Sequence, residues 1–367
     1  MLSIALTARP SYAKLHPILV ECCAQNLPVE VVACGSSLIT AHGAVADQVS
    51  RDFPSVPVTT LYTMLAGSTL TTSAKETGLL LASLADHYAR VRPALVLVMA
   101  DRHETLAVSM AASYQNIPVV HVQGGERSGN IDDRVRDANA MLATYHFPAT
   151  EFAAERLRSF VHEPHHVWNV GCPSIDVARQ AQALPPLLST AAFGGIGPVI
   201  SLRAPYLLLV QHPETEQPDA AYDHMMHLLR VVSQVPLPRL VLWPGQDAGQ
   251  EGGAKAIRHY LTAHPSESWA VLRAIPPLPF LQVLNQAAVL VGNSSAGIRE
   301  ASYLGTPVVN IGSRQRGRER AHNVLECEDA LAAIRRQLAG GRWPSSTLYG
   351  TGRAAPQLVG RLKGLPS

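Results

Sequence analysis

The chain has 367 residues, of which 47% are hydrophobic and 16% charged, so it is long enough for two domains that each bury a core. A net charge of +2 lacks the basic excess of a nucleic-acid-binding protein, and no apolar run reaches the roughly 18 residues of a membrane span. The five cysteines show neither CxxC pairs nor a disulfide framework, and we expect no signal peptide, because the N-terminal residues show no basic region and no cleavage site. We therefore expect a reduced, cytoplasmic protein that binds neither nucleic acid nor membrane.

The first half of the chain alternates predicted strands with predicted helices. Strands are predicted at residues 2–7, 29–33, 94–99 and 117–122, and helices at 13–25, 71–91 and from about 104 to 114. Arg9-Pro10-Ser11 is predicted to be a turn, and residues 36–69, rich in Ser, Thr, Gly and Pro, to be a long irregular loop. This alternation is typical of a parallel sheet covered by helices on both faces.

A second alternating series follows residues 176–198, which are rich in Ala, Pro, Gly and Ser and whose start is the predicted domain boundary. Strands are predicted at 206–210, 240–243, 270–273, 287–291 and 308–311, and helices at 220–233, 250–264, from about 278 and from about 295. The fold class is therefore α/β, with two doubly wound domains. Ligands of such sheets bind outside the carboxyl ends of the strands, so polar clusters there are expected to face a cleft between the domains.

The stretch from Val291 to Glu300 is the strongest candidate binding element. Gly292 ends a buried strand, and Asn293 and Ser294 can cap a helix that starts near Ser295. A helix start has unpaired N–H groups and partial positive charge, so two hydroxyls beside it form a cradle for phosphate. Glu300 is close enough to accept hydrogen bonds from a sugar hydroxyl. The plain alternative is an ordinary capped strand-to-helix turn.

Acidic residues follow two strands of the first domain. Asp101-Arg102 places a carboxylate and a guanidinium at the mouth of the cleft, unless Asp101 only caps the next helix. Gln123-Gly124-Gly125-Glu126 is followed by Asp132-Asp133, and several carboxylates within about ten residues suit proton transfer. The alternative for Asp132 and Asp133 is capping of the helix that they precede.

Basic residues follow strands of the second domain. His212 ends a strand and, as imidazolium, could meet a diphosphate, although a lone histidine can also be structural. Four arginines lie just beyond the phosphate cradle and either neutralise charge or form a solvated face; they are Arg314, Arg316, Arg318 and Arg320.

In this order and spacing, the residues resemble the UDP-N-acetylglucosamine 2-epimerase family, particularly its hydrolysing branch. The match runs almost end to end and comprises Arg9 through Lys14, Ala100-Asp101-Arg102, Gly124-Gly125-Glu126, Ser128-Gly129, Ile131-Asp132-Asp133, Gln211-His212-Pro213, Trp243-Pro244, Asp247-Ala248-Gly249, Gly292-Asn293-Ser294-Ser295 and Gly312 through Glu319. The non-hydrolysing branch lacks the Gly-Gly-Glu and Asp-Asp pattern, so the hydrolysing branch fits better.

The resemblance implies two Rossmann-like domains of glycosyltransferase-B architecture. They would span residues 1–176, on the sugar side, and 177–350, which would bind UDP, with residues 351–367 packing back on the first. It also implies that Arg9, Lys14, Arg102, His212, Ile275, Ser294, Ser295, Glu300 and Arg314 bind substrate. Ile275 would meet uracil through its backbone, and Glu300 would hold the ribose. Asp101, Gln123, Glu126, Asp132, Asp133 and His212 are the implied catalytic set.

The expected reaction eliminates UDP from UDP-N-acetylglucosamine to give a glycal, and water then yields N-acetylmannosamine. It requires no metal or other cofactor, and we expect a homodimer or homotetramer. Three alternatives stay open: a non-hydrolysing epimerase, a UDP-sugar glycosyltransferase, and a UDP-sugar-binding subunit with weakened catalysis.

The chain departs from the family pattern at four positions. Gln123 stands where relatives have a catalytic Glu, and Gln cannot exchange a proton; Glu126 or Asp133 would then take over. Gly245 and Ala13 replace Asn and Ser, which we expect to loosen substrate contacts. Asp137 replaces His and would either repel a negatively charged substrate or mark a different sugar.

Overall fold

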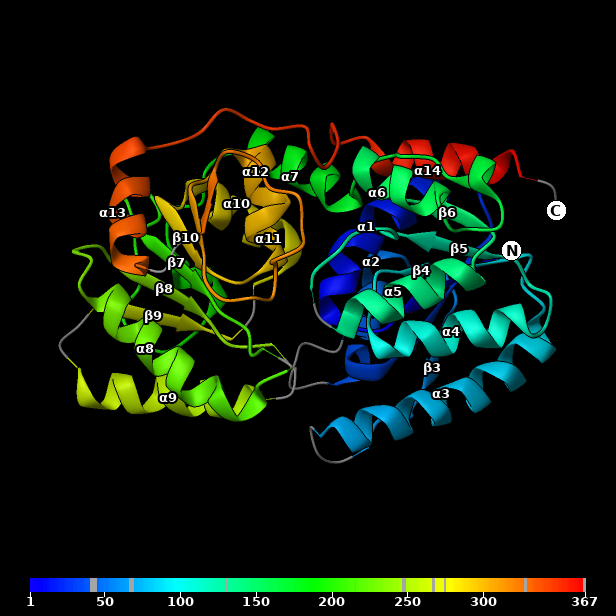
Figure 1. The fold of residues 1–367 in the computed structure, drawn as a ribbon, viewed down its shortest axis with the longest axis horizontal. Helices are drawn as coiled ribbons and strands as arrows, with labels where there is room; N and C mark the ends of the chain where they lie inside the picture. Colours follow the sequence, from blue (N-terminus) through cyan, green and yellow to red (C-terminus); the bar gives the residue numbers. More distant parts are fainter. Residues whose placement is uncertain are drawn as a thin grey trace. The chain divides into compact units, whose positions relative to one another are not determined.

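A computed structural model describes residues 1–39, 45–65, 69–129, 131–214, 216–245, 249–265, 268–273, 275–326 and 329–365. The chain forms two compact units, one of Met1–Asp176 with Tyr349–Ser367 and the other of Val177–Leu348 (Figure 1). Each unit contains one six-stranded parallel sheet with helices packed against it. The predicted α/β class, with two doubly wound sheets, is therefore confirmed.

The sheet of the first unit has the order β3-β2-β1-β4-β5-β6. Its strands are β1 (Leu2–Leu6), β2 (Val29–Cys34), β3 (Val58–Leu61), β4 (Leu95–Met99), β5 (Val119–Val122) and β6 (Tyr145–Phe147). Its helices are α1 (Arg9–Ala24), α2 (Val45–Asp52), α3 (Leu70–Val91), α4 (His103–Ser113), α5 (Ile131–Leu142), α6 (Glu151–Arg158) and α14 (Ala354–Lys363), with the short turns η1 (Gly35–Leu38) and η3 (Pro164–His166). The order reverses between β1 and β4, which is where ligands bind in such sheets.

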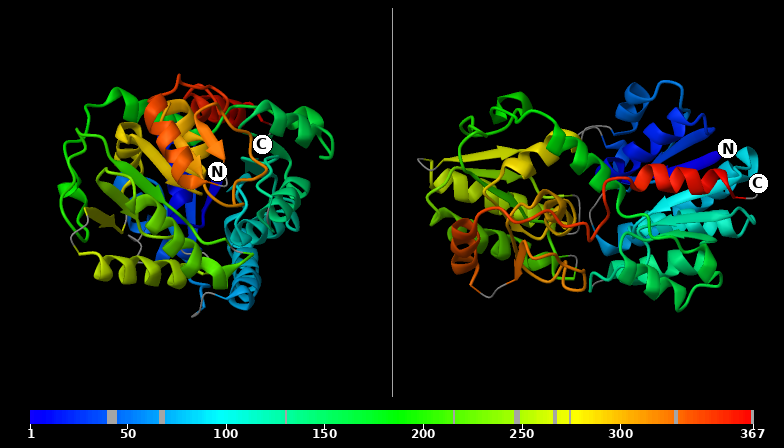
Figure 2. Two further views of the ribbon diagram at one scale, coloured as in Figure 1. Left: turned by 60° about the vertical axis from the view of Figure 1, so that its left-hand side comes forward. Right: turned by 90° about the horizontal axis from the view of Figure 1, so that it is seen from above.

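The central strands of this sheet are apolar on both faces, and separate cores cover the two faces. Leu2, Ile4 and Leu6 pack in one core with residues of α1 and α14, whereas Ala5 packs in the other with residues of α3 and α4. The further views in Figure 2 show helices on both sides of the sheet. The C-terminal segment belongs to this unit, since the carboxylate of Asp176 accepts the N–H groups of Ala354 and Ala355 at 2.8 Å each.

The sheet of the second unit has the order β12-β11-β10-β7-β8-β9, which reverses between β7 and β10. Its strands are β7 (Leu207–Val210), β8 (Arg239–Leu242), β9 (Trp269–Leu272), β10 (Val289–Gly292), β11 (Val308–Asn310) and β12 (Val324–Glu326). Its helices are α8 (Ala221–Ser233), α9 (Gln250–Ala263), α10 (Pro277–Gln286), α11 (Ser295–Ile298), α12 (Glu300–Leu304) and α13 (Ala330–Gly340), with the short turns η4 (Thr190–Phe193) and η5 (Pro218–Ala220). Helix α7 (Pro173–Ala183) contains the division between the units.

Two predictions about the first unit are wrong. Arg9-Pro10-Ser11 is the first turn of α1 rather than a free turn, because proline is compatible with the first positions of a helix. Residues 36–69 are not one irregular loop, since they contain η1, α2 and β3. Helix α2 has only 8 residues and β3 only 4, so both are shorter than the roughly 11–18 residues over which a hydrophobic period is read.

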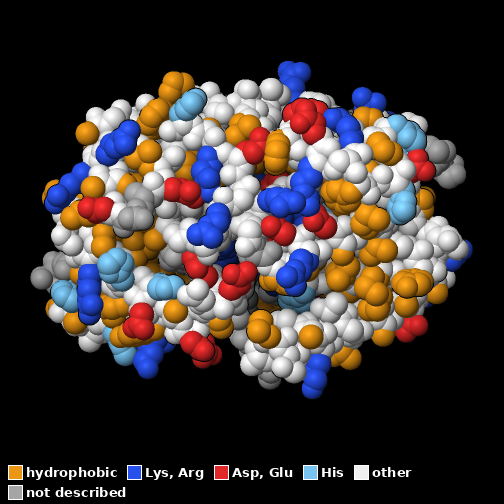
Figure 3. Space-filling view, viewed as in Figure 1, with side chains coloured by type: hydrophobic (Ala, Val, Ile, Leu, Met, Phe, Trp, Pro, Cys, Tyr) orange, Lys and Arg blue, Asp and Glu red, His pale blue; other side chains and the backbone are white. Residues whose placement is uncertain are grey.

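The described part of the chain contains no helix with the length and apolar character needed to cross a bilayer. On the face drawn in Figure 3, Lys and Arg side chains are interspersed with Asp and Glu, as the net charge of +2 would suggest. Cys22, Cys23, Cys34 and Cys172 are free thiols.

Candidate functional site

The expected acidic residues of the first unit follow β4 and its neighbour β5, next to the reversal of strand order. Ala100, directly after β4, and Gln123, directly after β5, have positive φ angles of 66° and 64°. Non-glycine residues seldom adopt this left-handed region, and such strain concentrates at functional sites. The backbone thereby places Asp101 and Gln123 at the carboxyl ends of the strands, where ligands generally bind in such sheets.

The guanidinium of Arg136, on α5, is the centre of this cluster. Its side chain is 1% exposed and pairs with the carboxylate of Asp101 and, at 2.6 Å, with that of Asp133. It also donates to the main-chain carbonyl of Glu126 at 2.6 Å. Burial alone would lower the pKa of Arg136, but the charges of Asp101, Glu126 and Asp133 outweigh burial and raise that pKa. The buried guanidinium of Arg136 thus interacts with the charges of three acidic residues.

The carboxylate of Asp133 closes the loop that precedes α5. It accepts the N–H of Ser128 at 2.6 Å, the hydroxyl of Ser128 at 2.8 Å and the N–H of Gly129 at 2.8 Å. Burial alone would raise the pKa of Asp133, but these bonds and the charge of Arg136 hold it below its usual range. Asp132 is half-buried beside it, and both residues lie within the first turn of α5 rather than before the helix.

Gln123 is buried and is held at both ends of its amide. Its Oε1 accepts from Nζ of Lys14 at 2.9 Å, and its Nε2 donates to Sγ of Cys172 at 2.7 Å. The thiol of Cys172 lies 2.8 Å from the hydroxyl of Ser174. These contacts fix the orientation of an amide that has no proton to exchange. The side chain of Arg9, also expected near this edge, lies outside the described part of the structure, as do Asp247 and Ala248.

Arg102 is oriented by Glu104, a residue that the sequence did not single out. Nε and Nη2 of Arg102 donate to the two carboxylate oxygens of Glu104 at 3.0 and 3.1 Å. Burial alone would raise the pKa of Glu104, but the charges of Arg102 and His103 and the bonds from Arg102 lower it. A Cβ atom on Gly35 would lie only 2.6 Å from Oε1 of Glu104, so this glycine leaves room for the carboxylate.

Two of the alternatives raised for carboxylates do not fit the structure. Asp101 is not a helix cap, because Arg102 occupies the N-cap of α4 and makes no capping bond with its side chain. Asp137 does not act as an uncompensated charge, because both of its oxygens accept from the guanidinium of Arg156, at 2.7 and 2.6 Å. The pairing removes the physical reason to expect Asp137 to repel an anionic substrate.

In the second unit, the candidate residues gather at the carboxyl ends of the adjacent strands β7 and β10. Asn293, which is fully buried, joins the two ends: its Oδ1 accepts the N–H of His212 at 2.7 Å, and its Nδ2 donates to the carbonyl of His212 at 2.8 Å. Gln315 in turn donates to the carbonyl of Asn293 at 2.9 Å. Arg314 reaches the same place and donates to the carbonyl of Pro213 at 3.3 Å.

The ring of His212 is held as a neutral imidazole. The main-chain N–H of Gly245 donates to Nδ1 of His212 at 3.1 Å, so Nδ1 carries a lone pair and the ring proton is on Nε2. The sequence left open an imidazolium at His212, but a ring protonated at Nδ1 cannot accept this bond. In the tautomer that accepts the bond, Nε2–H is the one N–H donor of the His212 ring.

The predicted helix start at Ser295 is confirmed, but the helix is short. Ser294 is the N-cap of α11, and its hydroxyl accepts the N–H of Ala296 at 3.3 Å. Glu300 is not in that helix: it opens α12, is 8% exposed, and no hydrogen bond is found for its Oε2 among the described residues. Ile275 is buried between β9 and α10.

Comparison with known proteins places the chain in a family. A family model described as UDP-N-acetylglucosamine 2-epimerase matches residues 22–363. The UDP-N,N'-diacetylbacillosamine 2-epimerase (hydrolyzing) of Legionella pneumophila is 29% identical over 350 residues, which are 93% of this chain and 89% of that protein. The UDP-N-acetylglucosamine 2-epimerase of Neisseria meningitidis is 25% identical over 352 residues, which are 94% of this chain and 89% of that protein.

Solved structures share the fold. The UDP-GlcNAc 2-epimerase of Methanocaldococcus jannaschii, in complex with UDP-GlcNAc and UDP, matches with a TM-score of 0.80 and 19% identity over 99% of both chains. The Neisseria meningitidis enzyme bound to UDP-GlcNAc matches with a TM-score of 0.77 and 19% identity, over 99% of this chain and 100% of that chain. Since the family model spans most of the sequence, this protein belongs to the UDP-N-acetylglucosamine 2-epimerase family.

Proposed function

We propose that this chain is a hydrolysing UDP-sugar 2-epimerase, with UDP-N-acetylglucosamine or a closely related UDP-sugar as substrate. The observation that carries the proposal is the buried Arg136 beneath Asp101 at the ligand-binding edge of the first sheet. An ion pair with a buried guanidinium favours the ionised form of a carboxylate, which is the form that a base needs. The hydrolysing relative from Legionella pneumophila and the Gly124-Gly125-Glu126 motif support this branch.

In the proposed reaction, a base takes the proton from C2 of the sugar, the C2–H electron pair forms a C1–C2 double bond, and the C1–O bond to UDP breaks. Water then adds to C1 of the glycal, and a proton returns to C2 from the opposite face. The sum consumes one water, gives free UDP and free sugar, and changes no overall oxidation state. We assign Asp101 to the first proton transfer and Asp132 to the second.

The other acidic residues take different roles in this proposal. Asp133 positions the loop and Arg136, because its oxygens are already occupied by Ser128, Gly129 and Arg136. Glu126 is buried, and its charge acts on the same guanidinium, so we assign it to replace the carboxylate that Gln123 lacks. Arg102, held by Glu104, and Lys14 contact the sugar or phosphate.

The second unit would hold UDP at the ends of β7 and β10. Ser294, Ser295, Arg314 and the Nε2–H of His212 would donate to the diphosphate. Glu300 would accept from the ribose, and the backbone of Ile275 would meet uracil. Stabilising the leaving diphosphate in this way lowers the barrier to elimination.

The test is incubation with UDP-N-acetylglucosamine in deuterium oxide, without an acceptor, followed by identification of every product. We expect equal amounts of UDP and free 2-acetamido-mannose with one deuterium at C2. Hydrogen retained at C2 would exclude elimination. A UDP-linked product would indicate the non-hydrolysing reaction, and bound UDP without turnover would indicate a binding subunit. A parallel reaction with UDP-N,N'-diacetylbacillosamine separates the two substrates that the relatives' names suggest.

A further inference from the structure

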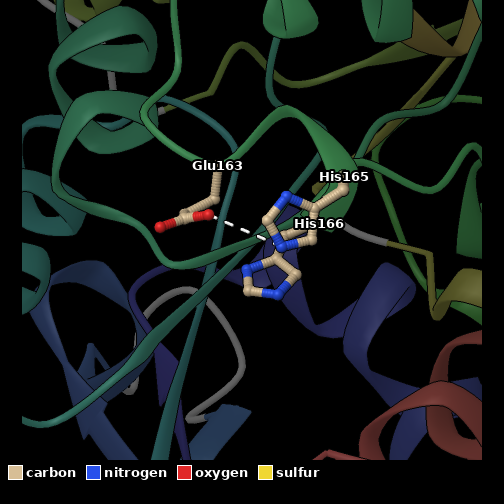
Figure 4. Close-up of side chains that lie close together, drawn as sticks. All are labelled: Glu163, His165 and His166. Atoms are coloured by element: carbon tan, nitrogen blue, oxygen red, sulfur yellow. Dashed lines mark ion pairs between the residues drawn. The ribbon is translucent and has the colours of Figure 1, made fainter.

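A second cluster of chemically active side chains lies outside the proposed active site. Glu163, His165 and His166 occupy the turn η3 and its flank, and each offers one ligand atom within 4.8 Å of the others (Figure 4). From their chemistry and geometry, we propose that these three residues bind a divalent transition-metal ion of the Zn²⁺ class. The proposal is independent of the reaction assigned above.

The donor set suits such an ion. Two imidazole nitrogens and one carboxylate oxygen are common zinc ligands, with bond lengths near 2.0–2.2 Å. In a tetrahedral site those lengths put neighbouring donor atoms about 3.3 Å apart. Oε2 of Glu163 and Nε2 of His165 are already 3.5 Å apart, without a metal between them. Both side chains are exposed, at 51% and 70%, so they can rotate to close the remaining gap to His166.

A hydrogen bond and ring packing hold the side chain of His166 in place. Its Nδ1 lies 3.2 Å from the carbonyl of Thr144, a contact in which Nδ1 must carry the proton, so Nε2 keeps its lone pair for a ligand. Its ring packs on Tyr145 and Trp168, with centroids 4.8 and 5.7 Å away. A carbonyl that holds the second nitrogen of a histidine is a regular partner of metal-binding histidines, because it sets the tautomer and orients the ring.

The position of the cluster separates it from the proposed active site of the same unit. Thr144 directly precedes β6, so His166 lies at the amino end of that strand. Asp101 and Gln123 follow the carboxyl ends of β4 and β5 in the same parallel sheet. A metal at Glu163, His165 and His166 would therefore lie at the opposite end of the strands from Asp101 and Gln123. Three protein ligands would leave its fourth coordination position to water.

The experiment is calorimetric titration of metal-free full-length protein with ZnCl₂ at pH 7.5. Because the chain has 15 histidines, the readout is the difference between variants. His165→Ala and Glu163→Gln each remove one donor from an exposed side chain. Each should weaken the site by at least the roughly 10–100-fold that loss of an outer-shell partner costs. His162→Ala is the matched control, since this exposed neighbouring histidine lies outside the cluster, and it should leave binding unchanged.

Three results would overturn the proposal: no saturable binding to the wild type, equal binding by His165→Ala, or equal binding by Glu163→Gln. Binding should also weaken as the pH falls, because imidazole must be unprotonated to coordinate. UDP affinity measured on the same variants should not change, so failure of the metal site would leave the proposed reaction untouched.

Discussion

The main-chain N–H of Gly245 donates a 3.1 Å hydrogen bond to Nδ1 of His212. A Cβ atom at position 245 would lie 3.0 Å from that same nitrogen, so the glycine supplies the donor and also leaves room for the ring. The bond selects the tautomer whose proton is on Nε2. Glycine in place of Asn at position 245 thus affects the packing of the His212 ring, in addition to any contact with substrate that Asn would make.

The neutral state of His212 predicts how substitutions affect UDP binding. His212→Gln keeps an N–H donor near the position of Nε2, whereas His212→Leu keeps only the bulk. We expect His212→Leu to lose about 1.5–3 kcal/mol of UDP binding, as for a hydrogen bond to a charged group, and His212→Gln to lose clearly less. Calorimetry at pH 6 and pH 8 measures the UDP affinity of both variants and of the wild type. A wild-type affinity that falls as the pH rises through about 6.5 would instead reveal an imidazolium.

The hydroxyls at the start of α11 give a second prediction. Ser294→Ala with Ser295→Ala should weaken UDP binding, each lost charge-assisted bond costing about 1.5–3 kcal/mol. Loss of the N-cap at Ser294 should also destabilise the fold by about 1 kcal/mol. Ser233→Ala, which removes a hydroxyl at the end of α8, is the control. Unchanged UDP affinity in the double variant would exclude the hypothesis that these hydroxyls bind the diphosphate.

Much of the fold and the placement of the candidate site at strand ends could be predicted from local patterns. Runs such as Leu95–Met99 and Val289–Gly292 are buried strands, and each is followed by polar residues. Because the carboxyl ends of parallel strands share one edge, Asp101 and Gln123 could be expected near each other, as could His212 and Asn293. Such a prediction needs only hydrophobic runs and the turns that end them.

The partners that set the chemistry could not be predicted in this way. Arg136 lies three residues after Asp133, a helical spacing that points to one pair, but nothing local indicates its bond to Asp101, 35 residues away. Cys172 meets Gln123 across 49 residues, and the room for Glu104 depends on Gly35. These contacts arise from the sheet order, which local periodicity does not specify.

Arg136 provides a prediction on stability. Arg136→Met should cost about 3–5 kcal/mol of unfolding free energy, because it leaves Asp101 and Asp133 without their buried counterion. Arg156→Met breaks a comparable two-point pair with Asp137, but that carboxylate is 36% exposed, so we expect a loss of about 1 kcal/mol or less. Urea unfolding compares the two. Equal losses would show that Arg136 has no special structural role.

Two buried histidines predict how stability depends on pH. Burial lowers the pKa of His121 to about 4 and that of His146 to about 3, so both are neutral in the folded protein. In the unfolded chain each binds a proton below about pH 6.5. Stability that is present above pH 6.5 is therefore lost as the pH falls, at about 1.4 kcal/mol per pH unit for each histidine, until the folded-state pKa is reached.

The variant His146→Leu isolates one of these contributions. Among the described residues, neither ring nitrogen of His146 has a hydrogen-bond partner, so leucine removes a titrating group without breaking a bond to any of them. The difference in unfolding free energy between variant and wild type should be constant above pH 7. It should then move in favour of the variant by about 1.4 kcal/mol per pH unit between pH 6.5 and 4. A difference that is flat over this range would show that His146 is protonated in the fold.

The remaining prediction concerns Gln123, which cannot transfer a proton. In Gln123→Glu, one carboxylate oxygen would pair with Nζ of Lys14, and the other would face Sγ of Cys172, whose S–H can turn to donate. The new acid should therefore be tolerated in the fold. If proton transfer limits the reaction, turnover should rise at least tenfold, which is a fraction of the roughly 10²–10⁴-fold that general acid–base catalysis supplies.

Glu126→Gln completes a double-mutant cycle with Gln123→Glu, measured as turnover of UDP-N-acetylglucosamine. If Glu126 now supplies the carboxylate that Gln123 lacks, Glu126→Gln should lower turnover by about 10²-fold in the wild type but far less in the Gln123→Glu background. Strong coupling between the two positions would mean that they share one task. Two independent effects that simply multiply would show that Glu126 has a separate role, and would leave Asp101 and Asp132 as the proton-transfer pair.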